Sequence, residues 1–276
     1  MIPRGSPAKA PFDPSFFERD RLFWPISGGA QAFSEYVEWP PVADYGARIS
    51  EAAAAGLLRS APRVAFREQP PKPRRRRRAT TRARDLYDGR IVEEGWVPTR
   101  PGSWHDFLNM LVWAVFPEAK QQLHARQHRA ISARLPAPED GAAGARPATL
   151  PNARTREQDA LALLDEGGVL IACRPAALES AREALRERRG DEALRLFAER
   201  EARAVVFGHA IFEGLVLGRE DGWAAAWFVA HDGDLGDDAA LVDALDSALA
   251  RELAEQGTFR SPADMSRADL HLIRPR

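Results

Sequence analysis

The sequence is poor in cysteine and lacks a long uninterrupted apolar run. Cys173 is the single cysteine among 276 residues, which excludes an internal disulfide and a multi-cysteine metal cluster and indicates a reducing compartment. Because it ends the apolar run 169–173, we interpret it as a small buried hydrophobe rather than a catalytic thiol. No segment reaches the roughly 20 apolar residues of a membrane span, and the first residues lack the apolar region of a signal peptide. We therefore expect a cytoplasmic protein with no membrane partner.

An excess of charge of one sign is also missing, since 39 Lys and Arg balance 40 Asp and Glu. The net charge of the protein therefore gives no overall electrostatic attraction for nucleic acid, a membrane surface or an acidic substrate. The local exception is a basic run consisting of Arg74, Arg75, Arg76, Arg77 and Arg78. No aromatic residues interleave with this run, so we interpret it as a solvated loop. The alternative is contact with an acidic partner or nucleic acid, which would depend on salt.

Three common catalytic signatures are absent as well. The sequence contains no Gly-rich phosphate loop, no dinucleotide fingerprint and no nucleophile elbow. Their absence removes the usual nucleotide, dinucleotide and esterase classes. A catalytic site in this protein would then have to be built from polar residues that lie within apolar segments.

The apolar fraction, 45%, is that of a globular protein. We predict a single, mainly helical α+β domain over residues 12–276, preceded by a disordered leader at 1–11 and interrupted by flexible loops at about 70–80 and 136–152. The sheet is expected to be small, with strands near 63–69, 160–173 and 223–230. Helices are expected at about 48–58, 104–116, 118–134, 175–188, 192–216 and 238–256.

Residues 159–173 fit two structures. They form either a helix closed by Gly167 followed by a strand, or two strands joined through Glu166-Gly-Gly168. Because Gly-Gly between apolar runs is a hairpin signal and 169–171 favours a strand, we favour the hairpin.

The apolar helix at 104–116 contains an unexpected amide. Ser103 and Asp106 have capping-box spacing at its start, and an acid there also suits the positive end of a helix. Asn109 interrupts a run that is apolar on every side, so we expect it to be buried. A buried amide without hydrogen-bond partners costs roughly 1–3 kcal/mol, which predicts a polar centre in the core.

Two helical faces can build that centre. His105 and Asn109 are four residues apart on the helix at 104–116, and His209 and Glu213 are four apart on the second apolar helix. Gly208 permits close approach of another element. If the faces meet, imidazoles and carboxylates converge in an acid/base or metal site, for which Asp165 and Glu166 supply further carboxylates. The alternative is a buried network that fixes helix register.

These patterns define the candidate residues. Candidate catalytic residues are His105, Asn109, His209, Glu213 and Asp165. Candidate ligands to a divalent metal are His105, Asp106, His209, Glu213 and Glu166. His124 and His128 also have helical ligand spacing, but polar neighbours surround them, so we assign them to a solvated face.

Several of these segments together resemble one bacterial family, domain of unknown function 3025. The similar segments are Trp104-His-Asp-Phe-Leu-Asn-Met-Leu-Val-Trp113, Phe116-Pro-Glu-Ala-Lys120, Leu164-Asp-Glu-Gly-Gly168, and Val206-Phe-Gly-His-Ala210 with Glu213. The resemblance covers most of the chain after about residue 60. It implies a cytoplasmic bacterial protein whose family has no established activity.

We therefore predict a hydrolase-like protein with a His/Asn/Glu centre that is either metal-assisted or acid/base, acting on a small molecule. The alternative is a non-catalytic module in which these residues are structural and the Arg74–Arg78 loop contacts an acidic partner or nucleic acid.

Overall fold

The computed structural model describes residues 10–69, 83–135, 154–219 and 221–274. Its helices and two small sheets form the expected mainly helical α+β domain. The α-helices are α1 (Ser27–Gln31), α2 (Tyr45–Ala54), α3 (Tyr87–Glu94), α4 (Trp104–Val115), α5 (Pro117–Ser132), α6 (Arg156–Gly167), α7 (Leu178–Arg186), α8 (Gly190–Ala198), α9 (His209–Val216), α10 (Asp238–Ala254) and α11 (Leu270–Ile273). The strands are β1 (Ala65–Glu68), β2 (Trp96–Thr99), β3 (Gly168–Cys173), β4 (Ala202–Val206), β5 (Trp223–Ala230) and β6 (Ser266–Asp269).

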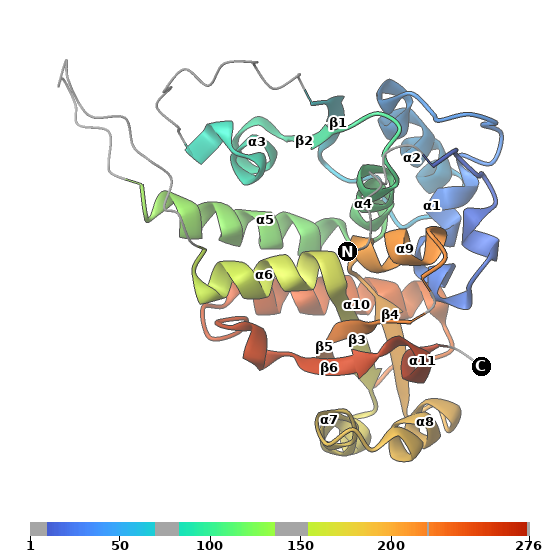
Figure 1. The fold of residues 1–276 in the computed structure, drawn as a ribbon, viewed down its shortest axis with the longest axis vertical. Helices are drawn as coiled ribbons and strands as arrows, with labels where there is room; N and C mark the ends of the chain where they lie inside the picture. Colours follow the sequence, from blue (N-terminus) through green and yellow to red (C-terminus); the bar gives the residue numbers. More distant parts are fainter. Residues whose placement is uncertain (1–9, 70–82, 136–153, 220, 275–276) are drawn as a thin grey trace, which may run out of the picture.

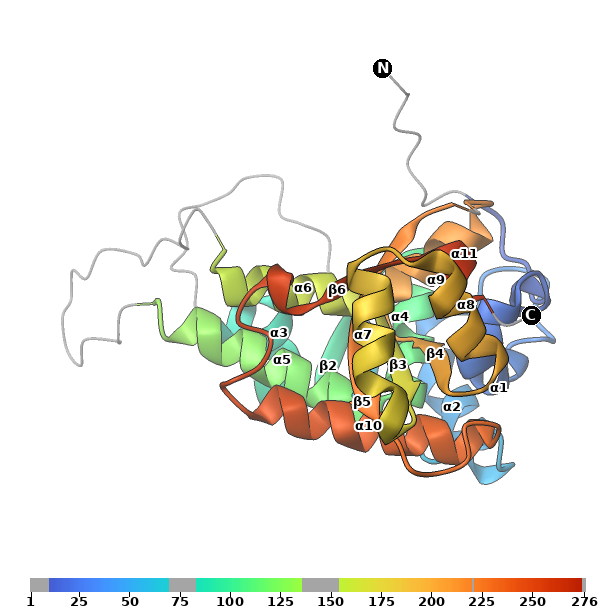
Figure 2. The same ribbon diagram turned by 90° about the horizontal axis from the view of Figure 1, so that it is seen from below.

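The larger sheet has the strand order β4-β3-β5-β6. β3 pairs in parallel with β5, so that Leu170 lies opposite Trp227, whereas the two outer pairings are antiparallel. All six residues of β3 are buried, as expected for a central strand that reads as a continuous apolar run. α5 and α6 lie on one side of this sheet and α7 and α8 on the other (Figures 1 and 2). β1 and β2 form a separate parallel pair.

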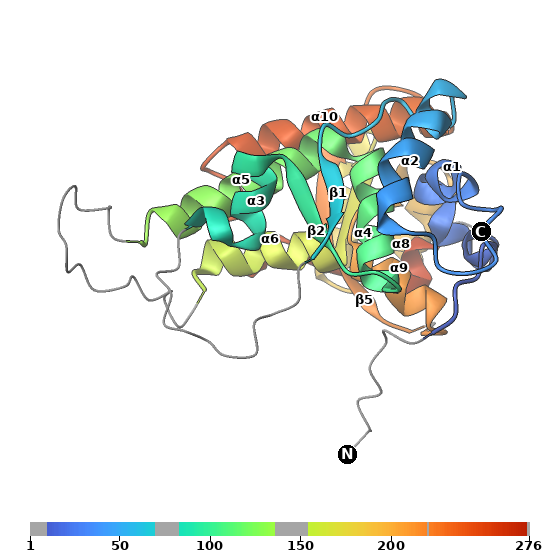
Figure 3. The same cartoon turned by 90° about the horizontal axis from the view of Figure 1, so that it is seen from above.

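The helix predicted at 104–116 is confirmed as α4. The Ser103 side chain caps it by accepting a hydrogen bond from the Asp106 backbone N–H at 3.4 Å. Pro117 ends this helix and begins α5, because proline suits the first helical position but not a helix interior. The N-terminal segment and α2 pack beside α4 (Figure 3). Aromatic rings dominate that contact, including Phe16 against Trp104.

The single helix predicted at 192–216 is wrong. The segment divides into α8, β4 and α9. Arg200 adopts a left-handed conformation with φ 56°, which ends the first helix. The β-branched pair Val205-Val206 then continues β4, which pairs with β3, and Gly208 caps α9. Helical spacing of apolar residues across the turn produced the error.

The hairpin predicted at 159–173 is also wrong, because the chain forms helix α6 followed by strand β3. Thr155 and Gln158 make a reciprocal capping box that starts the helix. Ala160, Leu161 and Leu164 then supply its buried face. Gly168 is the first residue of the strand rather than part of a two-residue turn.

Some predictions concern parts of the chain outside the described residues. The Arg74–Arg78 run, the loop at 136–152 and most of the leader at 1–11 belong there. Phe12, which follows the leader, is buried against α4. None of the helices in the described ranges has the length and hydropathy required to cross a membrane.

Cys173 provides a direct test of the core. Its side chain is buried at the end of β3, and burial raises the pKa of its thiol to about 12. We therefore expect a thiol-reactive chromophore to leave the native protein unmodified at pH 8 and to modify one thiol per chain in denaturant. Rapid stoichiometric modification of the native protein would contradict this packing.

Candidate functional site

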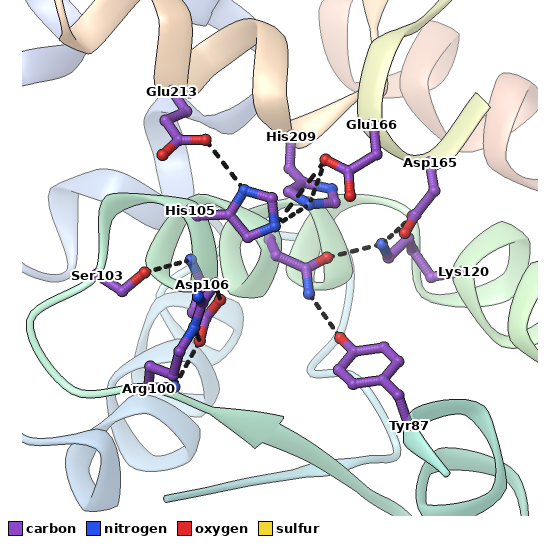
Figure 4. A network of polar contacts seen from close by, with 11 residues as sticks. Tyr87, Arg100, Ser103, His105, Asp106, Lys120, Asp165, Glu166, His209 and Glu213 are labelled. Atoms are coloured by element: carbon purple, nitrogen blue, oxygen red, sulfur yellow. Dashed lines mark hydrogen bonds and ion pairs between the residues drawn. The ribbon is translucent and has the colours of Figure 1, made fainter. Parts of the chain in front are cut away.

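The polar residues of α4 and α9 face each other in the structure (Figure 4). His105 Nδ1 lies 3.0 Å from Glu213 Oε2, and His105 Nε2 lies 3.0 Å from His209 Nε2. An ionised carboxylate accepts hydrogen bonds and cannot donate, so Glu213 fixes the proton of neutral His105 on Nδ1. His105 therefore presents the lone pair of Nε2 toward His209.

Close backbone packing brings Glu166 to the same place. The Gly168 carbonyl accepts hydrogen bonds from the backbone N–H groups of Phe207, at 3.1 Å, and Gly208, at 2.8 Å. A Cβ on Gly208 would lie only 2.6 Å from the Glu166 carbonyl oxygen. The α6–β3 junction thus lies directly against the start of α9, which sets Glu166 beside His209.

Three side chains form a candidate metal centre at this junction. His105, Glu166 and His209 each offer a ligand atom, and these atoms lie within 4.8 Å of one another. The Glu166 oxygen is 3.3 Å from His209 Nε2 and 3.9 Å from His105 Nε2. Ligand atoms around a tetrahedral Zn²⁺ are roughly 3.3–3.6 Å apart, because each bond is about 2.0–2.2 Å long. The two imidazole nitrogens are 3.0 Å apart. Together with the 3.3 and 3.9 Å to Glu166, the three separations lie on both sides of that range.

Burial and charge give the three groups different proton affinities. The hydrogen bond that His105 donates to Glu213 raises the pKa of His105 despite partial burial. Burial lowers the pKa of His209 to about 3, although the nearby Asp165 acts in the opposite direction. Burial raises the pKa of Glu166. His209 is therefore neutral at pH 7, and in the tautomer that carries its proton on Nδ1 it can bind a cation through Nε2.

A fully buried lysine contacts Asp165 and Asn109, on the side of the site away from Glu213. Lys120 of α5 has 0% exposure, and its ammonium forms an ion pair with Asp165. The same ammonium donates a hydrogen bond to Asn109 Oδ1 at 2.7 Å, and Asn109 Nδ2 donates to the Tyr87 hydroxyl at 3.0 Å. Burial alone raises the pKa of Asp165, but the charge of Lys120 brings it below its usual value. Asn109 is buried, as predicted, and both ends of its amide are satisfied.

These groups line a pocket of about 310 Å³. Its wall includes Tyr87, His105, Asn109, Asp165, Glu166 and His209. The side chain of Glu166 is 49% exposed, so the polar centre is open to solvent rather than sealed in the core. A small molecule can therefore approach His105, which is partly exposed, whereas His209 lies almost fully covered behind it.

Three candidate residues lie outside the group of three ligand atoms. Asp106 lines the pocket but accepts hydrogen bonds from the Arg100 backbone and guanidinium, and it lies outside the group of three metal ligand atoms. Asp165 points to Lys120 rather than to the imidazoles. Glu213 contacts His105 on the nitrogen away from His209, so it orients this histidine rather than joining the three ligand atoms.

The assignment of His124 to a solvated face is wrong. The residue is buried, its Nδ1 lies 2.8 Å from Asp88 Oδ1, and its ring stacks on Trp113. α3 covers this face of α5, which the local sequence does not reveal. His128 is half-buried and pairs with Glu93.

Sequence reasoning missed Lys120 and Tyr87 as members of the site. A signal for Lys120 exists, since Ala119, Lys120 and Leu123 have helical spacing and share the buried face of α5. Tyr87 is the first residue of α3, and no local pattern links it to Asn109.

The fold and site together define an α+β domain with a histidine- and carboxylate-lined pocket. A family model described as Protein of unknown function (DUF3025) matches residues 76–268, and the chain belongs to this family. The match includes α4, α6 and α9, which confirms the resemblance, although it begins later than residue 60. Comparisons with curated proteins and with solved structures returned no match.

The close approach at Gly208 can be tested with a pair of glycine variants. Gly208→Ala should destabilise the protein by about 1–3 kcal/mol, because the added methyl group overlaps backbone atoms of the α6–β3 junction. Gly214→Ala in α9 is the matched control, since its Cβ would meet nothing closer than 3.9 Å. We expect this control to be neutral or stabilising by up to about 1 kcal/mol in urea unfolding. Equal effects of the two variants would contradict the close contact.

The buried ion pair predicts strong non-additivity. Lys120→Met leaves the Asp165 carboxylate without its partner and should lower the free energy of unfolding by about 3–5 kcal/mol. The double variant Lys120→Met/Asp165→Leu should be clearly more stable than the sum of the single effects predicts. Urea unfolding of the four proteins measures this coupling. Additive effects would show that the two side chains do not interact.

Proposed function

We propose that this protein is a metal-assisted hydrolase whose divalent cation is held by His105, His209 and Glu166. One observation supports this most directly: two imidazole nitrogens and one carboxylate oxygen lie together at separations that fit a single ion. Three protein ligands leave a further coordination position free, which is typical of catalytic rather than structural zinc sites.

The residues around these ligands support the same function. Glu213 orients His105 through Nδ1, a contact that histidine ligands in metal sites commonly make. A bound cation would lower the pKa of water and polarise a substrate bond. Because the pocket is open beside Glu166, water and a small substrate can both reach the ligands.

A second candidate is acid/base hydrolysis without a metal. The contact between His105 and Glu213 supports it, since a carboxylate behind an imidazole is the usual arrangement of a histidine general base. In this case His105 Nε2 would take a proton from water, and the net reaction would add one water across the bond that is cleaved.

The non-catalytic alternative receives less support. A register-fixing network needs no opening to solvent, yet the polar centre lines a pocket. The Arg74–Arg78 run, on which an acidic or nucleic-acid partner would depend, lies outside the described residues. The cytoplasmic location and the bacterial origin stay predictions from the sequence.

Elemental analysis tests the metal site. The protein, purified without a histidine tag and incubated with Zn²⁺, Mn²⁺ or Fe²⁺, should retain about one ion per chain after desalting. His209→Leu and Glu166→Gln should lose the ion, because each removes a ligand atom. Glu213→Gln should weaken affinity by roughly 10–100-fold, because it disturbs the orientation of His105.

His271→Leu is the matched control, since His271 is exposed on α11, away from the pocket. It should retain the ion. A wild-type protein that retains none of the three metals would refute the metal-assisted proposal. Hydrolysis that survives chelation but is lost in Glu213→Gln would instead support the acid/base candidate.

A further inference from the structure

Asn109 links Lys120 to Tyr87 through two hydrogen bonds, and the donor and acceptor of each bond are fixed. An ammonium can only donate, so the atom of Asn109 that faces Lys120 must be the carbonyl oxygen. The amide is thereby oriented, and its Nδ2 must donate to the Tyr87 hydroxyl, 3.0 Å away. The Tyr87 oxygen is thus an acceptor from Asn109, which leaves its own proton available.

The structure offers that proton no acceptor among the described residues. Tyr87 makes a single hydrogen bond there, the one from Asn109. Tyr87 as a whole residue is 39% exposed, and it lines the same pocket as His105, Glu166 and His209. Figure 4 shows the Tyr87 ring below the two imidazoles, with its hydroxyl on the side of α4, where it meets Asn109 Nδ2. The O–H group is therefore free to donate into the pocket.

We infer that Tyr87 donates this hydrogen bond to the carbonyl oxygen of an acyl substrate, an amide or an ester, an inference that rests on the proposed function. In acyl hydrolysis the water oxygen bonds to the carbonyl carbon while the π pair moves onto the carbonyl oxygen. The pair returns when the bond to the leaving group breaks, and the proton lost by the water ends on that group. Tyr87 keeps its own proton throughout and stabilises the charge on the carbonyl oxygen.

The charge of the pocket favours an acyl group over a phosphoryl group. The lining residues include four carboxylates, Asp88, Asp106, Asp165 and Glu166, against two arginines, Arg100 and Arg154. Arg100 is already paired with Asp106, and the buried Lys120 with Asp165, which leaves Arg154 as the single cation of this lining without an ion pair among the described residues. Recognition of a phosphate dianion requires available cations, preferably bidentate arginines. A neutral carbonyl requires a donor such as Tyr87, and the charge of Lys120 behind Asn109 polarises that donor.

Binding of acetohydroxamate, an acyl compound with two oxygen donors, tests the inference on the metal-loaded protein. Tyr87→Phe should bind this probe roughly 10-fold or more weakly than wild type, because it lacks the O–H donor, while its metal content stays the same. Tyr36→Phe is the matched control, since the Tyr36 hydroxyl contacts Asp44 and Arg48 outside the pocket. Calorimetric titration of the probe and elemental analysis of each protein give the two readouts.

Asn109→Asp provides a second variant that retains the hydroxyl. The new carboxylate can only accept, so the Tyr87 hydroxyl would donate its hydrogen bond to residue 109 rather than into the pocket, and the direction of that bond would be reversed. We expect the same loss of probe affinity as in Tyr87→Phe, with metal content unchanged. A merely structural role for Tyr87 predicts no such equivalence.

The outcomes separate the two proposals. Absence of metal from the wild type overturns the proposed function and this inference with it. If metal is present and Tyr87→Phe binds acetohydroxamate as the wild type does, the inference alone is overturned. Inorganic phosphate that displaces the probe at equal or lower concentration would overturn the acyl assignment.

Discussion

The ammonium of Lys120 organises the interior around the site. It lies between the Asp165 carboxylate and the Asn109 amide oxygen, with no exposure to solvent. A charge in this position is tolerated because its partners surround it. Through these two partners it connects α5 to α6 and to α4. The Lys120 ammonium therefore fixes the positions of Asn109 and Asp165, which both line the pocket.

Backbone packing supplies the second constraint. The Gly168 carbonyl accepts from two consecutive N–H groups at 207–208, and Gly208 leaves no room for a side chain. The end of α6, the start of β3 and the start of α9 consequently meet at one point. Glu166 and His209 are adjacent because of that meeting, while His105 reaches them from α4.

The mainly helical α+β class and several side chains that meet in the candidate site could be predicted from the sequence, but two of the elements around them could not. Asn109 could be recognised because one amide in an apolar helix demands partners, and the four-residue spacing of His209 and Glu213 placed them on one face. The same spacing misled at 192–216, where a turn at Arg200 and a strand interrupt the apparent periodicity. The burial and contacts of Lys120, Tyr87 and His124 depend on which helix packs against which. That is tertiary information, which a local sequence pattern does not contain. Asp106 shows the converse, because a local Arg100 contact explains it.

The contacts that hold the site together span very different lengths of chain. α5 begins at Pro117, directly after α4, and Lys120 of α5 contacts Asn109 of α4 across only 11 positions of the chain. His105 and His209 meet across 104 positions. Closing a longer loop costs more chain entropy, by about 0.6 kcal/mol for each doubling of length. On chain entropy alone, the contact between α4 and α5 is therefore less costly to close than the contact between the two histidines.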